Sequence, residues 1–111
     1  MSVLEDVKKL GIAERFMGYA KIDTQSADEA AAVPSTAKQH DLAKLLYEEM
    51  QRIGLADVSY DEKNCYVYGY VPASEGVEAE TIGFVDHMDT APQFTGTGVK
   101  PKIFLYEGGD I

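Results

Sequence analysis

The alternation of hydrophobic and polar residues predicts helices in the first half of the chain and strands in the second. In the first twenty residues, apolar side chains recur with a rough helical period that is interrupted near Gly11, which predicts one broken helix or two short ones. Ser2 and Glu5 have the spacing of a capping box at its beginning. Residues 23–34 are rich in Asp, Ser, Thr and Ala without useful periodicity, and they predict a loop. The apolar positions of the first helical region are Val3, Val7, Leu10, Phe16, Met17 and Ala20.

A second apolar stripe predicts a longer helix that stops at Gly54. Thr36 and Gln39 again fit a capping box and would begin it. His40 falls in this helix next to Asp41, so we expect it to be a solvated side chain and not a metal ligand. The stripe consists of Leu42, Leu45, Leu46, Met50 and Ile53.

Runs of β-branched and aromatic residues predict strands in the second half. Residues 57–60 fit a short strand, and residues 64–71 alternate cleanly between two faces. The aromatic preference for strands favours packing of the tyrosine face beneath a helix. Because Cys65 is the only cysteine, we expect a buried reduced thiol and no internal disulfide. One face carries Cys65, Val67 and Val71, and the other carries Tyr66, Tyr68 and Tyr70.

The apolar run at residues 81–85 predicts a buried strand that ends in a histidine. His87 and Asp89 would then emerge at its carboxyl end, where open α/β sheets place their ligands. An imidazole that binds a metal through one nitrogen needs its tautomer fixed through the other, and a carboxylate two residues later can turn back to do this. The pattern therefore suggests His87 as a metal ligand oriented by Asp89, although this spacing alone is a weak signal.

Composition limits the class of protein. With 111 residues, 45% of them hydrophobic, the chain can form one domain at most with a real core. Nineteen acidic against ten basic side chains give a formal charge of -9, so nucleic acid and anionic membranes are not expected partners. No apolar stretch approaches the roughly 20 residues that cross a bilayer. Charged residues stand where a signal peptide would be apolar, so we expect a cytoplasmic protein.

Several motifs, in order along nearly the whole chain, resemble the amino-terminal part of the peptidase T family, the tripeptide aminopeptidases of the M20 group of zinc metallopeptidases. Separated motifs in a conserved order are far more specific than His-x-Asp alone. The matching motifs are ERF at 14–16, IDTQS at 22–26, VPST at 33–36, GFVDHMDT at 83–90, VKPKI at 99–103 and GGDI at 108–111.

The resemblance implies an α/β fold in which N-terminal helices are followed by strands. Residues 1–111 would be an incomplete, N-terminal portion of the three-layer αβα catalytic domain, without the rest of that domain and without the dimerisation or lid domain. His87 matches the family's first zinc ligand, and Asp89 matches the carboxylate that orients it. The family site holds two zinc ions and cleaves the amino-terminal residue from short peptides. Its remaining ligands and its glutamate base would lie beyond Ile111.

The sequence departs from the family pattern near the predicted site. Asp86 stands where the family has a small residue, and adjacent side chains of a strand point to opposite faces, so we expect Asp86 and His87 to diverge. Gln93 stands where close relatives often have an acid. The roles of Asp86, Thr90 and Gln93 therefore stay open, and no substrate-binding residue is assigned.

Three hypotheses about the function of the isolated chain follow. As a segment of a zinc aminopeptidase it should be inactive and bind zinc weakly or not at all, because a catalytic zinc needs about three protein ligands. As a truncated, non-catalytic α/β domain it would act only as a folding or self-association module, and its unpaired strand edge predicts self-association. The third hypothesis is an unrelated α/β binding module in which His87-x-Asp89 is incidental.

Overall fold

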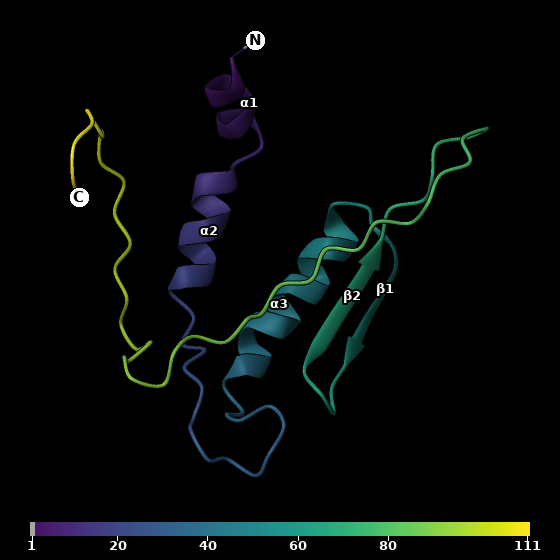
Figure 1. The fold of residues 1–111 in the computed structure, drawn as a ribbon. Helices are drawn as coiled ribbons and strands as arrows, with labels where there is room; N and C mark the ends of the chain where they lie inside the picture. The colour runs from purple at the N-terminus through teal and green to yellow at the C-terminus, as the bar shows by residue number, and fades with distance from the viewer. Residues whose placement is uncertain (1) are drawn as a thin grey trace.

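The computed structural model describes residues 2–111 and contains three helices followed by a β-hairpin (Figure 1). The prediction of helices first and strands afterwards is therefore confirmed, and the chain is a small α/β structure. The elements are α1 (Val3–Lys9), α2 (Ile12–Ala20), α3 (Gln39–Arg52), β1 (Ala56–Asp61) and β2 (Tyr66–Tyr70).

The first helical region consists of two short helices, as the interruption near Gly11 predicted. The capping box is present, because the Glu5 amide donates to Ser2 Oγ at 3.3 Å and the Ser2 amide donates to Glu5 Oε2 at 3.0 Å. Gly11 separates α1 from α2 with a φ of 63°, a left-handed conformation that glycine adopts without strain. Neither helix buries a residue, so their apolar positions remain accessible.

Helix α3 is confirmed, but its predicted capping box is wrong. The helix begins at Gln39, and the residue before it, Lys38, makes no side-chain cap. The Thr36 hydroxyl instead donates to the main-chain oxygen of Gln25 at 2.8 Å and accepts from Gln39 Nε2 at 3.0 Å. The hydroxyl oxygen that would accept from a main-chain amide in a capping box therefore accepts from the Gln39 side chain instead. Gly54 follows the helix with a φ of 88°.

A buried carboxylate joins α2 to α3. The side chain of Glu49 is only 7% exposed, and Arg15 Nε donates to its Oε1 at 2.9 Å. The Tyr19 hydroxyl donates to the other carboxylate oxygen, and Arg52 Nη2 lies 3.5 Å from Oε1. Burial by itself raises the pKa of Glu49, but the hydrogen bonds from Tyr19 and Arg15 and the charges of the arginines outweigh it and leave the pKa below its ordinary value.

Strands β1 and β2 form the predicted hairpin, and α3 lies against one of its faces (Figure 1). The strands pair antiparallel from Asp61 opposite Tyr66 to an irregular end at Ala56. Gly69 allows the close approach of α3, since a methyl group there would lie 2.8 Å from Leu55 Cδ1 and 3.2 Å from Met50 Sδ. The buried apolar residues are Leu42, Ala43 and Cys65.

The expected packing of the tyrosine face beneath a helix is wrong. Tyr66, Tyr68 and Tyr70 are all exposed, and the rings of Tyr66 and Tyr68 meet edge to face with centroids 6.2 Å apart. Helix α3 takes the other face, where Gly69 faces Met50. In residues 2–111 no second helix covers the tyrosine face. The aromatic preference for strands therefore places these tyrosines in β2 although their side chains are not buried.

The buried strand predicted at residues 81–85 is also not formed. The run is irregular, and Phe84 and Val85 are 91% and 95% exposed. A strand exists only through main-chain hydrogen bonds to a neighbour, and β1 and β2 pair with each other. Within the described chain, the one bridge outside the hairpin joins Gln25 to Thr90, just after this run.

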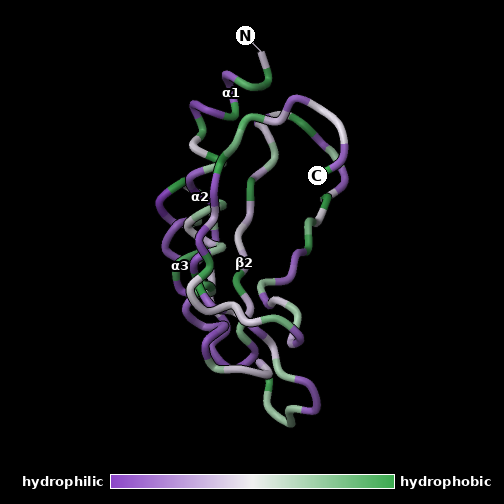
Figure 2. The backbone as a smooth tube through the Cα atoms, turned by 90° about the vertical axis from the view of Figure 1, so that its left-hand side faces the viewer, coloured by the Kyte–Doolittle hydropathy of each residue, from purple (hydrophilic) through white to green (hydrophobic). Residues whose placement is uncertain are grey.

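The molecule is expanded for its length. Its radius of gyration is 17.1 Å, whereas a compact domain of this size has about 13 Å. The segment after residue 97 stands apart from the helices and the hairpin, and its hydrophobic stretch is not covered (Figures 1 and 2). None of the helices in residues 2–111 has the length and apolar character to span a membrane.

Candidate functional site

The two residues singled out by the sequence are in contact. His87 Nδ1 lies 2.8 Å from the main-chain oxygen of Asp89 and 3.1 Å from its carboxylate Oδ1. The His87 side chain is 84% exposed and that of Asp89 is 42% exposed. The turn of the carboxylate back onto the imidazole is thus present, with a second acceptor from the same residue.

These contacts decide which imidazole nitrogen carries the proton. A main-chain carbonyl oxygen can only accept a hydrogen bond, so Nδ1 of His87 must be the donor. In the neutral ring, Nε2 then holds the free lone pair. This is the tautomer that a histidine needs to bind a metal through Nε2.

A groove of about 580 Å³ runs beside His87. Segments far apart in the sequence form its walls, so it is a product of the tertiary structure. Burial raises the pKa of the Cys65 thiol, which leaves the thiol protonated and fits the expected structural role. The lining residues are Val33, Pro34, Ser35, Gln39, Asn64, Cys65, Tyr66, Val85, Asp86, His87, Met88 and Asp89.

The described residues do not form a complete metal site by themselves. In residues 2–111, no three His, Cys, Asp or Glu side chains come together as a metal site. Asp86 lines the same groove as His87, whereas Gln93 is exposed outside it. The donor set fits a histidine that would complete a site together with ligands from elsewhere.

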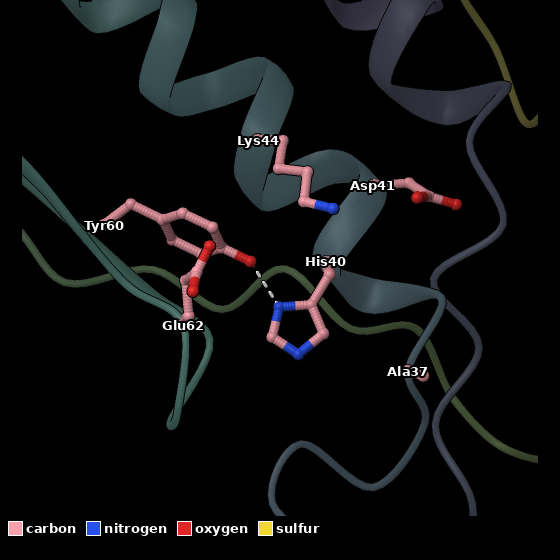
Figure 3. Close-up of a pocket in the computed structure, with 6 residues that line it drawn as sticks. All are labelled: Ala37, His40, Asp41, Lys44, Tyr60 and Glu62. Carbon is pink, nitrogen blue, oxygen red and sulfur yellow. Dashed lines mark hydrogen bonds between the residues drawn. The ribbon is translucent and has the colours of Figure 1, made fainter.

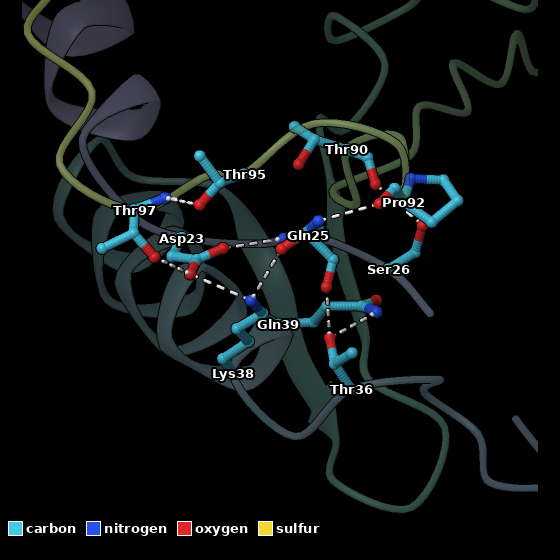
Figure 4. Close-up of polar contacts among 10 residues, drawn as sticks. All are labelled: Asp23, Gln25, Ser26, Thr36, Lys38, Gln39, Thr90, Pro92, Thr95 and Thr97. Atoms are coloured by element: carbon cyan, nitrogen blue, oxygen red, sulfur yellow. Dashed lines mark hydrogen bonds and ion pairs between the residues drawn. The ribbon is translucent and has the colours of Figure 1, made fainter. Parts of the chain in front are cut away.

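The backbone next to Asp89 is held by residues 23–26, which we call the anchor loop (Figure 4). The Thr90 amide donates to the Thr24 oxygen at 3.1 Å, and the Thr90 oxygen accepts from the Ser26 amide at 2.9 Å and from Ser26 Oγ at 2.8 Å. Gln25 Nε2 donates to the Pro92 oxygen at 2.9 Å. Thr24 itself is buried. Residues 87–90, which we call the site segment, are therefore fixed by hydrogen bonds that begin at Thr90, one residue after Asp89.

Asp23 is the centre of the same network (Figure 4). Its Oδ2 accepts from Lys38 Nζ and from Thr97 Oγ1, each at 2.9 Å, and its Oδ1 accepts from the Gln25 amide at 3.1 Å. The Lys38 hydrogen bond, followed by that of the Gln25 amide, lowers the pKa of Asp23. Gly96 passes so close that an added methyl would lie 2.5 Å from Asp23 Oδ1.

Sequence reasoning did not find the anchor loop. It predicted a loop at residues 23–34, which is confirmed, but it did not predict the hydrogen bonds of this loop to residues 90–97, although the segment 22–26 belongs to the motifs that resemble the family. The concentration of side-chain donors and acceptors there was the available signal. Which main-chain groups they meet depends on a partner about 65 residues away in the sequence, which spacing cannot reveal.

His40 is not the solvated side chain that the sequence predicted. It is half-buried, its Nδ1 is hydrogen-bonded to the Tyr60 hydroxyl, and the two rings meet edge to face with centroids 6.0 Å apart (Figure 3). The hairpin brings β1 against the beginning of α3, and this creates the contact. Both residues line a shallow pocket of about 330 Å³ with Ala37, Asp41, Lys44 and Glu62.

Comparison with known proteins agrees with the motifs. The chain is 50% identical over 104 residues to a peptidase T of Geobacillus thermodenitrificans and 46% identical over 104 residues to one of Geobacillus kaustophilus, in each case 93% of this chain and 25% of the relative. It is 48% identical to a peptidase T of Clostridium botulinum over 101 residues, which is 90% of this chain and 24% of the relative.

The resemblance to peptidase T is confirmed. No protein-family model matches the chain. The chain spans about a quarter of the length of the curated peptidase T relatives that it matches.

Proposed function

We propose that this chain is a segment of a zinc-dependent aminopeptidase of the peptidase T kind, which releases the amino-terminal residue of tripeptides in the cytoplasm. His87 is one zinc ligand, and Asp89 is the carboxylate that orients it. The segment is the N-terminal portion of an M20 catalytic domain, and the identification of its relatives as peptidase T supports peptidase chemistry. By itself it is inactive and binds zinc weakly.

The contact between His87 and Asp89 carries this proposal. When the ring is neutral, this contact leaves the Nε2 lone pair of an exposed imidazole free beside a groove, in a chain whose relatives are named peptidase T. A buried core histidine would have both nitrogens occupied and its ring covered. The groove is large enough for a few amino-acid residues, as a short peptide substrate requires.

The chemistry divides between this chain and ligands from outside it. When bound at such a site, zinc polarises a carbonyl and lowers the pKa of an attacking water. His87 supplies one nitrogen ligand, and Asp89, through its main-chain oxygen and its carboxylate, keeps the ring in the required tautomer and orientation. No residue of the described chain is placed as the general base.

The two histidines of the chain allow a matched test of the metal role. In calorimetric titrations with Zn²⁺, we expect weak binding by the unmodified chain that His87→Ala abolishes and His40→Ala preserves. Hydrolysis of tripeptides should be undetectable for all three proteins. Binding that survives His87→Ala but not His40→Ala, or zinc-dependent turnover by the isolated chain, would contradict the proposal.

A chimera tests the enzyme role directly. Residues 2–111 would replace the aligned segment of the Geobacillus thermodenitrificans peptidase T, which is 50% identical over 104 residues. We expect the chimera to hydrolyse tripeptides and the His87→Ala chimera to lose about 10³-fold or more in rate, since a catalytic zinc would lose a ligand. An active His87→Ala chimera would rule out the assigned role, and His40→Ala serves as the control for folding.

A second candidate is a non-catalytic module that acts only through folding and self-association. The observation that favours it is the large uncovered apolar surface of residues 81–85 and 103–106. The two candidates differ in the chimera, because a module without catalytic residues would not respond to His87→Ala.

A further inference from the structure

The peptide unit that joins Asp89 to Thr90 makes hydrogen bonds on both of its sides. Its carbonyl oxygen, that of Asp89, accepts from His87 Nδ1 at 2.8 Å. Its N–H, that of Thr90, donates to the Thr24 oxygen at 3.1 Å. One rigid group therefore lies between the candidate zinc ligand and the anchor loop.

The planarity of this unit couples the two hydrogen bonds. In a trans peptide, the C=O and the N–H lie in one plane and point in opposite directions. When the Thr90 N–H is directed at the buried Thr24, the Asp89 carbonyl is directed away from the anchor loop and toward His87. Rotation of the unit would break both hydrogen bonds together.

Ser26 restrains the next peptide unit, which joins Thr90 to Ala91. The Thr90 oxygen accepts from the Ser26 amide at 2.9 Å and from Ser26 Oγ at 2.8 Å (Figure 4). Thr90 is thus held on its amide side and on its carbonyl side, while the run before His87 is exposed and unpaired. The restraint on the His87 ring comes from the residues after it.

We propose that the anchor loop positions His87 through the main chain: Thr24 fixes the Asp89–Thr90 peptide, whose carbonyl sets the tautomer and direction of the imidazole, and Ser26 fixes the peptide that follows it. The Asp89 carboxylate, at 3.1 Å, is the second and longer acceptor. Thr24 and Ser26 are positioning residues that touch neither metal nor substrate. The proposal rests on the proposed function only for its consequence, a weaker metal site when the ring is free to turn.

The test measures the His87 tautomer in the metal-free 111-residue chain, by nitrogen NMR of labelled histidine at a pH that keeps imidazoles neutral. In the unmodified chain we expect Nδ1–H as the major form. Asp89→Ala removes the carboxylate but leaves the carbonyl, so Nδ1–H should remain the major form. Thr90→Pro removes the N–H that Thr24 binds, and it should shift His87 toward the Nε2–H form that a free imidazole prefers.

Ser26 and Thr97 supply milder variants and a control. Ser26→Ala should lower the Nδ1–H fraction, and Ser26→Thr, which keeps the hydroxyl, should restore it. Thr97→Ala removes a threonine hydroxyl from the same network without touching Thr90, so the tautomer should stay unchanged. Far-UV circular dichroism of each variant checks that the overall helix and strand content is unchanged.

Two outcomes would overturn the proposal. The first is loss of the Nδ1–H form in Asp89→Ala, which would assign the tautomer to the carboxylate alone. The second is an unchanged tautomer in both Thr90→Pro and Ser26→Ala. The tautomer is measured on metal-free protein. A failure of His87 to bind zinc would therefore count against the proposed function but not against the positioning of His87 by the anchor loop.

Discussion

At the scale of single residues, several side chains owe their properties to one close contact. The tautomer of His87 is set by the two acceptors of Asp89. His40 lies in the first turn of α3, and its ring is hydrogen-bonded to the Tyr60 hydroxyl of β1. Cys65 is 4% exposed in the turn before β2 and has a φ of 60°. The two histidines therefore differ in their partners, because they lie in different surroundings.

Cys65 should react slowly with thiol reagents in the native chain. Burial raises the pKa of its thiol, so the reactive thiolate is scarce, and a reagent must wait for a local opening. We expect alkylation by iodoacetamide to be about tenfold slower or more than in the urea-unfolded chain, measured by mass spectrometry. Equal rates in the two states would show that the hairpin does not protect the thiol.

Gly96→Ala should detach the loop around Thr97 from the anchor loop. The added methyl would lie 2.5 Å from Asp23 Oδ1 and 3.3 Å from Asp23 Cα, so the loop must move, at a cost of about 1–3 kcal/mol. Amide hydrogen exchange of residues 95–97 should become faster. Gly83→Ala is the matched control, because a methyl there meets nothing within 4 Å. Unchanged exchange in Gly96→Ala would mean that the close approach to Asp23 is absent in solution.

At the scale of elements, three kinds of contact hold the structure together. Helix α3 packs on the hairpin through apolar contacts such as Met50 with Gly69. Helix α2 is joined to α3 by the buried Glu49, and the site segment is joined to the anchor loop at Thr90. The first contact depends on burial of apolar surface, and the other two on hydrogen bonds and charge.

The link between α2 and α3 should weaken in acid. The pKa of Glu49 is held below its ordinary value of 4.5, so the folded state favours the carboxylate. The resulting stabilisation is complete above that ordinary value and is lost as the pH falls below it, through the lowered pKa. Hydrogen exchange of α2 amides, corrected for the intrinsic rate, should show less protection at low pH while the amides of α3 stay protected.

The Glu49→Gln variant provides the control for this acid effect. It removes the charge that Arg15 and Arg52 bind, and it should cost about 1–3 kcal/mol of α2 protection at neutral pH. Its α2 protection should then be independent of pH in the same range. If Glu49→Gln lost protection in acid as the unmodified chain does, another carboxyl would be responsible.

At the scale of the whole molecule, apolar surface and net charge act against each other. Phe84, Val85 and Leu105 are almost fully exposed, and the tyrosine face of the hairpin is uncovered. Such a surface favours association, while a formal charge of -9 repels a second copy. Salt screens the repulsion, with a Debye length of about 10 Å at 0.1 M, and leaves the apolar attraction in place.

The isolated chain should therefore self-associate, and more strongly at high salt. Light scattering should give an average mass above 12.2 kDa that increases with protein concentration and from about 20 mM to about 500 mM salt. Replacing Phe84 and Val85 by Ser should lower that mass, and Val77→Ser, in an exposed turn, is the control. A monomer at millimolar concentration in high salt would contradict this prediction.

Interactions between near neighbours could be derived from the sequence. The capping box of Ser2 with Glu5, the break at Gly11, helix α3 and the alternation of the hairpin all follow from contacts within a few residues. The same holds for the contact of His87 with Asp89, which needs only a spacing of two. The metal role of that pair stays a prediction.

The tertiary structure decided which of these local possibilities is used. Thr36 could cap α3, but the helix begins only at Gln39, whose side chain donates to the Thr36 hydroxyl. The run at 81–85 has strand propensity but no strand beside it. The anchor loop meets Thr90 across more than sixty residues. Propensity and spacing describe what a segment can do alone, whereas burial and main-chain pairing need a partner, and only the folded chain determines where that partner lies.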